Sequence, residues 1–300
     1  MRRGVVLAAA LLTLAGCTPA GTDGNLTNGW AAFPAATTPT PAVGACYDRP
    51  YRPTGTGDFH GAVDCATARH ETETVFVGSF TDADAKREAP PLAGSDSRKA
   101  AFAKCVTAAH DYLGGDWSDA KVTLGLVVPD DAAWTGGARW YRCDVEQYKD
   151  SALQILSYYT SAKGGLTGDR PLAITCITVT DDGKGSVTDW ADTTCDKPHN
   201  GEYAGTYTAS DAAWPTDVTT RHSLAKSGCE SMVAQFLGFS GNTYQSNYLG
   251  WMASGFDVDR WTAGDRSERC YVLAITGSTA NSTRILGSVK GLRDGAPHKA

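Results

Sequence analysis

The sequence lacks several features that would assign it to a common class. Beyond residue 16 it has no apolar run long enough to cross a membrane. It also lacks Gly-x-Ser-x-Gly, a phosphate-binding loop and His-Glu-x-x-His, the patterns of serine hydrolases, nucleotide-binding enzymes and zinc peptidases. Acidic residues outnumber basic ones, and the formal net charge is −6. This balance argues against nucleic acid as a partner.

The first residues are those of an export signal. Two arginines precede a largely apolar run over residues 5–14, which is too short for a transmembrane helix. The next residues, Leu14-Ala15-Gly16-Cys17, resemble the bacterial lipobox, in which a diacylglycerol is joined to the cysteine and the chain is cut just before it. We therefore expect residues 1–16 to be a signal peptide. Cys17 is expected to carry the lipid anchor, with acyl chains such as palmitate.

Residues 17–41 are rich in Thr, Pro, Ala, Gly and Asn and contain few core-forming side chains. We expect them to be a disordered tether between the lipid and the folded part. With Cys17 lipidated, eight of the nine cysteines remain, and no Cys-x-x-Cys pair occurs among them. An even number of cysteines in an exported protein predicts disulfides rather than a metal site. We expect no metal and no cofactor.

The rest of the chain repeats itself. The eight cysteines form two sets of four, with spacings of 19, 40 and 38 residues in the first set and 19, 34 and 41 in the second. His-x-x-Glu and Trp-x-x-Gly-x-Arg recur at matching places in both sets. The sequence therefore predicts two copies of one unit, over residues 42–166 and 167–293, followed by a tail at 294–300.

Each copy has the pattern of strands, one helix and further strands. The helices are predicted over Ser97–Leu113 and Thr220–Leu237, with Asp96 or Thr219 as N-cap and a glycine after each helix as its stop. The expected strands are Ala173–Val179, Thr74–Val77, Lys121–Val128, Arg139–Val145 and Ile155–Thr160. This order predicts an α+β fold, with an antiparallel sheet covered by one helix in each repeat.

Four cysteines in a unit allow three pairings. We favour the first with the second, because these two flank a single β excursion. The third would then pair with the fourth and join the helix to the sheet. The expected disulfides are Cys46–Cys65, Cys105–Cys143, Cys176–Cys195 and Cys229–Cys270. Loops of this length would stabilise the fold by about 3–4 kcal/mol per bridge in the chain-entropy description.

Together these motifs resemble the septum formation family of actinobacterial envelope proteins. The second copy carries the family pattern as Cys195-Asp-Lys-Pro-His199-Asn-Gly-Glu202, Cys229 and Trp261-Thr-Ala-Gly-Asp-Arg266-Ser-Glu-Arg-Cys270. The first copy has one extra residue between its second cysteine and its histidine and lacks the proline, and the second copy has Ile174 in place of the glycine of Gly-x-Cys. The resemblance covers residues 42 to about 292. It implies an envelope protein, commonly a lipoprotein or otherwise membrane-anchored, without a known reaction.

Two His-x-x-Glu pairs are candidates for acid–base chemistry or metal binding, namely His70 with Glu73 and His199 with Glu202. Residues three apart on a strand face opposite sides of the sheet, so we do not expect each pair to converge. We favour a structural role. The histidine would hydrogen-bond where a strand begins, and the glutamate would pair with Arg139 or Arg266.

Two tryptophans lie beside arginines at matched positions, Trp134 with Arg139 and Trp261 with Arg266. An aromatic ring stacked with a guanidinium would serve as a ligand platform. We favour instead a core tryptophan packed near the bridge between the third and fourth cysteines.

One motif favours an enzyme. Ser223-Leu-Ala-Lys226 matches the Ser-x-x-Lys element of penicillin-binding proteins. However, no Lys-Thr-Gly element follows, and Lys99 stands at the matching place in the first copy. A cell-wall-directed hydrolase or acyl-enzyme that uses Ser223 or His199 is therefore the alternative hypothesis.

We expect a lipoprotein held on the extracytoplasmic face of the cell membrane. It would act without catalysis, as a binding or scaffold module of the cell envelope linked to septum formation. The expected partners are the membrane, through the lipid anchor, and envelope proteins or cell-wall components, with no nucleic acid.

Overall fold

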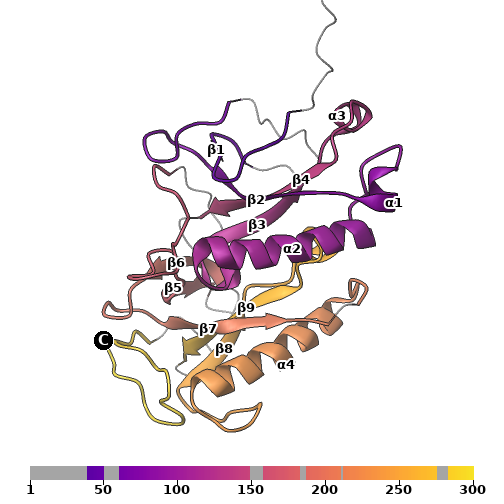
Figure 1. The fold of residues 1–300 in the computed structure, drawn as a ribbon. Helices are drawn as coiled ribbons and strands as arrows, with labels where there is room; N and C mark the ends of the chain where they lie inside the picture. The colour runs from indigo at the N-terminus through magenta and orange to yellow at the C-terminus, as the bar shows by residue number, and fades with distance from the viewer. Residues whose placement is uncertain (1–38, 51–60, 149–157, 183–186, 211, 276–282) are drawn as a thin grey trace, which may run out of the picture. The chain divides into compact units, whose positions relative to one another are not determined.

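Two antiparallel sheets, each packed against one long helix, form the folded part of the computed structural model (Figure 1). The structure describes residues 39–50, 61–148, 158–182, 187–210, 212–275 and 283–300, all within one compact unit. The signal peptide expected at 1–16, Cys17 and the tether up to residue 38 lie outside the described residues. So does half of the strand expected at 155–160.

The first sheet has four strands in the order β1-β2-β4-β3, with antiparallel neighbours throughout. Its elements in chain order are β1 (Cys46–Tyr47), β2 (Thr72–Ser79), α1 (Asp82–Ala85), α2 (Asp96–Leu113), the 3-10 helix η1 (Trp117–Asp119), β3 (Val122–Val127), α3 (Asp131–Thr135) and β4 (Trp140–Gln147). Helix α2 packs against β2, β3 and β4. Its buried face joins the sheet in one apolar core.

The second sheet has five antiparallel strands in the order β6-β5-β7-β9-β8. Its elements are β5 (Cys176–Asp181), β6 (Val187–Thr193), β7 (Gly201–Thr208), α4 (Val218–Phe236), β8 (Leu249–Ala253), α5 (Val258–Ala263) and β9 (Ser267–Ala274). Helix α4 packs against β7, β8 and β9.

The two sheets share one topology once β6 is set aside. Strands β1, β2, β4 and β3 correspond to β5, β7, β9 and β8 in both chain order and sheet order. The correspondence extends to a register irregularity, which falls between Thr74 and Phe76 in β2 and between Tyr203 and Gly205 in β7. The predicted α+β fold with two similar units is confirmed. Strand β6, at the edge of the second sheet, was not predicted.

The long helices begin slightly earlier than the sequence suggests. Ser95 caps α2 by accepting a hydrogen bond from the Arg98 backbone N–H, and Asp217 caps α4 in the same way through Thr220. The expected caps, Asp96 and Thr219, were wrong because an acceptor side chain lies one or two residues earlier in each case and reaches the free N–H groups of the first turn.

Four disulfides join the cysteines that the sequence pairs: Cys46–Cys65, Cys105–Cys143, Cys176–Cys195 and Cys229–Cys270. In each repeat the second bridge joins the long helix to the last strand. It therefore fastens the two layers of the core directly to one another. The first bridge of each repeat holds the first strand to the segment that follows it.

Candidate functional site

Each repeat contains a buried histidine just before one of its long strands. His70 precedes β2 and forms an isolated backbone bridge with Tyr158, and His199 precedes β7 and forms one with Ile285. Their Nδ1 atoms lie 3.1 Å and 2.8 Å from the carbonyl oxygens of the residues two positions earlier. Both rings are buried, with 1% and 0% exposure. Neither Nε2 has a hydrogen-bond partner among the described residues.

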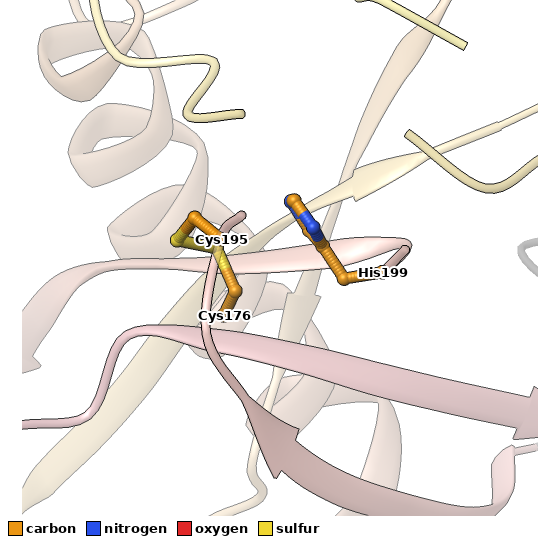
Figure 2. A group of neighbouring side chains, drawn as sticks. All are labelled: Cys176, Cys195 and His199. Atoms are coloured by element: carbon orange, nitrogen blue, oxygen red, sulfur yellow. A yellow bond between two sulfur atoms is a disulfide. The ribbon is translucent and has the colours of Figure 1, made fainter. Parts of the chain in front are cut away.

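The histidine in each repeat lies beside the first disulfide. Ligand atoms of Cys176, Cys195 and His199 all lie within 4.8 Å of one another, and Figure 2 shows the imidazole next to the two sulfurs. In the first repeat the same distance encloses atoms of Cys46, His70 and Glu73. The prediction that His70 and Glu73 point apart was wrong. The histidine stands before the strand begins, so the strict alternation of a strand does not apply to it.

Strand register places the glutamate in the same corner. Cys46 is the cross-strand partner of Glu73, and Cys176 is the cross-strand partner of Glu202. Directly opposed residues of an antiparallel pair present their side chains on the same face of the sheet. The same topology therefore places a disulfide cysteine, a histidine and a glutamate in one corner of each repeat, although Glu202 lies outside the 4.8 Å group of the second repeat. We call this arrangement the His–disulfide corner.

The glutamates are held by a segment that the sequence reasoning missed. Glu73 accepts hydrogen bonds from the Ser161 hydroxyl at 2.5 Å and the Ala162 backbone N–H at 2.6 Å. Glu202 accepts the equivalent bonds from Ser288 and Val289, at 2.5 Å and 2.7 Å. The signal was present in the chain, since Ser161-Ala-Lys-Gly164 recurs as Ser288-Val-Lys-Gly291 beyond the last cysteine of each repeat.

The first repeat adds a third donor to its glutamate. The Tyr112 hydroxyl donates to Glu73 at 2.5 Å. Burial and this hydrogen bond raise the pKa of the Tyr112 phenol, so it remains a proton donor at neutral pH.

The predicted pairing of Glu73 with Arg139 was wrong. Arg139 donates instead to the backbone carbonyls of Ala85, Trp134 and Ala138. Its guanidinium lies 4.2 Å from the ring centre of Trp134, and that of Arg266 lies 5.7 Å from the ring centre of Trp261. Both indoles are buried, and each donates its N–H to a backbone carbonyl, of Arg87 and Ala212 respectively. These contacts agree with the core interpretation of the tryptophans.

An open groove lies between β2 and α2 of the first repeat. It has a volume of about 740 Å³ and is lined by apolar and small side chains together with three charged ones, Lys104, Asp111 and Lys163. The lining residues that matter for the argument are Phe76, Ala103, Lys104, Ala108, Tyr112 and Lys163. The Lys163 ammonium lies 5.9 Å from the ring centre of Tyr112.

The second repeat fills the matching space with its own side chains. Alignment on the third cysteine places Met232 at the position of Ala108 and Gly228 at that of Lys104. A Cβ on Gly205 would lie 2.6 Å from the Met232 methyl, and a Cβ on Gly228 would overlap the Tyr207 ring. The helix and strand of the second repeat are thus packed closely where those of the first leave a groove.

Ser223 and Lys226, the residues of the alternative hypothesis, are both exposed on α4. The Lys226 ammonium lies 3.8 Å from a Glu230 carboxylate oxygen on the same helix. This ion pair orients the lysine along the helix surface.

Among the described residues, no helix is both long and apolar enough to cross a membrane. The chain matches no curated protein and no solved structure. It does match the septum formation family, over residues 43–270, which include the first sheet, both long helices, all four disulfides and the second sheet up to the middle of β9. This match extends over more than half of the sequence. The chain belongs to the septum formation family.

Proposed function

We propose that this protein is an exported lipoprotein, anchored through Cys17 on the outer face of the cell membrane. Its two repeats act there as a non-catalytic binding or scaffold module of the cell envelope. The four disulfides support an extracytoplasmic location, since such bridges persist in oxidising compartments. The tetrapeptide Leu14-Ala15-Gly16-Cys17 supports the anchor.

The groove between β2 and α2 is the observation that carries the binding role. The duplicated fold does not need this groove, because the second repeat closes the equivalent space with Met232 and Tyr207. An open apolar groove on a soluble unit marks a place where another molecule is bound. We infer that the first repeat receives an envelope protein or cell-wall component here and that the second repeat serves as its support.

Filling the groove tests this role. Ala108→Met places the second repeat's own side chain at the equivalent position of the first repeat. Ala100→Met is the matched control, because Ala100 is exposed on the same helix and does not line the groove. We expect Ala108→Met to lose the partners labelled by proximity in living cells, whereas Ala100→Met keeps them. Equal labelling by both variants would contradict a binding role for the groove.

The anchor and the location are tested separately. Wild-type protein is expected to incorporate a clickable palmitate analogue and to concentrate at division sites in fluorescence images. Cys17→Ser is expected to lose the label and to leave the membrane fraction. Uniform membrane fluorescence without division-protein neighbours would defeat the septal part of the proposal. Labelling by a covalent serine-directed probe that disappears in Ser223→Ala would favour the acyl-enzyme instead.

A further inference from the structure

We propose that each His–disulfide corner is a redox-gated zinc site. Reduction of Cys46–Cys65 and of Cys176–Cys195 converts each corner into a set of two thiolates, one imidazole and one carboxylate. That set suits Zn²⁺ or a divalent ion of similar preference, which binds cysteine sulfur, histidine nitrogen and carboxylate oxygen in four-coordinate sites.

The ligand atoms are already close together in the oxidised protein. Cys176, Cys195 and His199 offer three within 4.8 Å of one another, and Cys46, His70 and Glu73 offer three in the first repeat. The fourth ligand lies outside this distance in each repeat and is Cys65 in the first and Glu202 in the second. Cys65 is bonded to Cys46, and Glu202 pairs across the strands with Cys176 as Glu73 does with Cys46.

The histidines are oriented as metal ligands are. A histidine that binds a metal through one ring nitrogen usually donates its other N–H to a carbonyl or carboxylate, which fixes the tautomer. Here the Nδ1 of His199 lies 2.8 Å from the Lys197 carbonyl oxygen and that of His70 lies 3.1 Å from the Ala68 carbonyl oxygen. Donation from Nδ1 leaves a lone pair on Nε2, which has no partner among the described residues although both rings are buried. Such a buried acceptor is costly unless something binds it.

Hydrogen bonds fix the positions of the two glutamates as well. Glu73 and Glu202 are each held by a serine hydroxyl and a backbone N–H, and the serine hydroxyl in turn accepts a hydrogen bond from the N–H of Lys163 or Lys290. These donors hold the carboxylate in place in the oxidised protein, and none of them belongs to a disulfide. Carboxylates that bind a metal are usually hydrogen-bonded in this way by groups of the outer shell, which orient them.

One cysteine of each corner bridge lies nearer the surface than the other. Cys46 and Cys176 are fully buried, whereas Cys65 and Cys195 are partly exposed. In the first repeat, Cys65 and Glu73 line an open hollow of about 580 Å³. By contrast, all four cysteines of the Cys105–Cys143 and Cys229–Cys270 bridges are fully buried in the cores. None of these four belongs to a metal-ligand group of the described residues.

The chemistry balances with an exported dithiol as the reductant. A thiolate of the dithiol attacks the sulfur of Cys65 or Cys195, and the S–S bond breaks to release the buried cysteine as a thiolate. The second thiol of the dithiol then resolves the mixed disulfide, so the dithiol is oxidised by two electrons and the corner is reduced. Binding of Zn²⁺ displaces the two thiol protons to solvent.

The test uses Co²⁺ as a spectroscopic substitute for zinc on the full chain. The protein is reduced in graded steps under anaerobic conditions, and alkylation with mass mapping shows which bridges have opened. We expect the oxidised protein to bind no Co²⁺. Protein with only the two corner bridges open is expected to bind two ions, with thiolate-to-cobalt absorption. His70→Ala and His199→Ala should each weaken one of the two binding events at least tenfold, whereas His222→Ala, an exposed histidine on α4, should leave both unchanged.

Two further results would overturn the proposal. One is a reduced, folded protein that binds no Co²⁺ or binds it equally well in the double variant His70→Ala/His199→Ala. The other is that the fold is lost when the corner bridges open, whether or not zinc is present. Circular dichroism measures this loss. Zinc that binds the reduced native state must raise its melting temperature by mass action. Neither result depends on the groove or on the lipid anchor, so the function proposed above would stand or fall separately.

Discussion

Arg269 donates its Nε–H to the backbone carbonyl of Ser118 at 2.9 Å, so a side chain of the second repeat ends on the main chain of the first. Its Nη2 donates to the carbonyls of Ala120 and Val122 at 3.0 Å and 2.9 Å. The guanidinium also lies 5.3 Å from the ring centre of Tyr148. One buried arginine thus satisfies three carbonyls of the other repeat.

The equivalent arginine of the first repeat makes no such connection. Arg142, which also precedes the fourth cysteine of its repeat, lies 2.7 Å from an Asp144 carboxylate oxygen and 4.6 Å from the ring centre of Tyr47. Its contacts therefore stay inside the first repeat. The two repeats share the arginine at this position but use it differently, for an ion pair within the first repeat and for a connection between repeats in the second.

Arg269→Gln is expected to loosen the two repeats from one another. Three hydrogen bonds from a charged donor are lost, although the Tyr203 and Tyr148 hydroxyls still donate to the Ser118 and Ala120 carbonyls. We expect a decrease of about 3 kcal/mol in the free energy of unfolding. Native-state hydrogen exchange should show the second repeat opening before the first. Arg142→Gln is the matched control and should destabilise the first repeat without separating the two. A single cooperative opening in both variants would contradict this role of Arg269.

The serines that hold the buried glutamates give a second prediction. Ser161→Ala and Ser288→Ala each remove one donor from a buried carboxylate and one acceptor from a lysine backbone N–H. We expect a loss of about 1–3 kcal/mol in the free energy of unfolding for each variant. The effect should be smaller in Ser161→Ala, because Tyr112 remains as a donor to Glu73. Urea denaturation measures both, and Ser227→Ala on the exposed face of α4 serves as the control.

Much of the fold was predictable because it follows from local patterns. The helix windows ending at Leu113 and Leu237 agree with α2 and α4 to within two residues, since apolar periodicity and a following glycine define them. Cysteine spacing and the repeat were sufficient to favour the disulfide pairs that the structure contains. Strand β6 was missed because its residues are mostly exposed and polar, as an edge strand's often are.

The candidate sites were harder to predict because they depend on distant segments. Nothing near Glu73 in the chain indicates that Ser161, 88 residues away, donates to it. The groove of the first repeat depends on side-chain size across a helix and a strand, and only the comparison of Ala108 with Met232 shows that it is specific to one copy. Side-chain volume leaves no periodic signal in a single sequence.

Substitution of Trp134 tests whether this residue has a core role or forms a ligand platform. Its ring is fully buried, packs against Phe80 at 5.8 Å between ring centres, and donates to the Arg87 carbonyl at 2.8 Å. Trp134→Ala is expected to cost about 3–5 kcal/mol in the free energy of unfolding. The measurement is thermal and urea denaturation, with the exposed Tyr159→Ala as control. A stable Trp134→Ala variant that loses only ligand or partner binding would favour the platform instead.

The pH dependence of stability should reveal the buried carboxyl of Glu268. Burial raises the pKa of Glu268 above its ordinary value of 4.5, although hydrogen bonds from Ser254 and Gly255 act in the opposite direction. Because the folded state holds the proton more tightly than the unfolded chain, stability falls as pH rises from 4.5 through the raised pKa. Glu268→Gln keeps an acceptor for the same donors but has no proton to lose.

The free energy of unfolding of Glu268→Gln relative to wild type should therefore increase with pH across that window and become constant above it. Urea denaturation of both proteins between about pH 4 and pH 8 measures this difference. The direction is opposite to that of a carboxylate stabilised by an ion pair, whose contribution grows as pH rises. A difference that is constant over the whole range, or that decreases with pH, would mean that the hydrogen bonds from Ser254 and Gly255 outweigh the effect of burial.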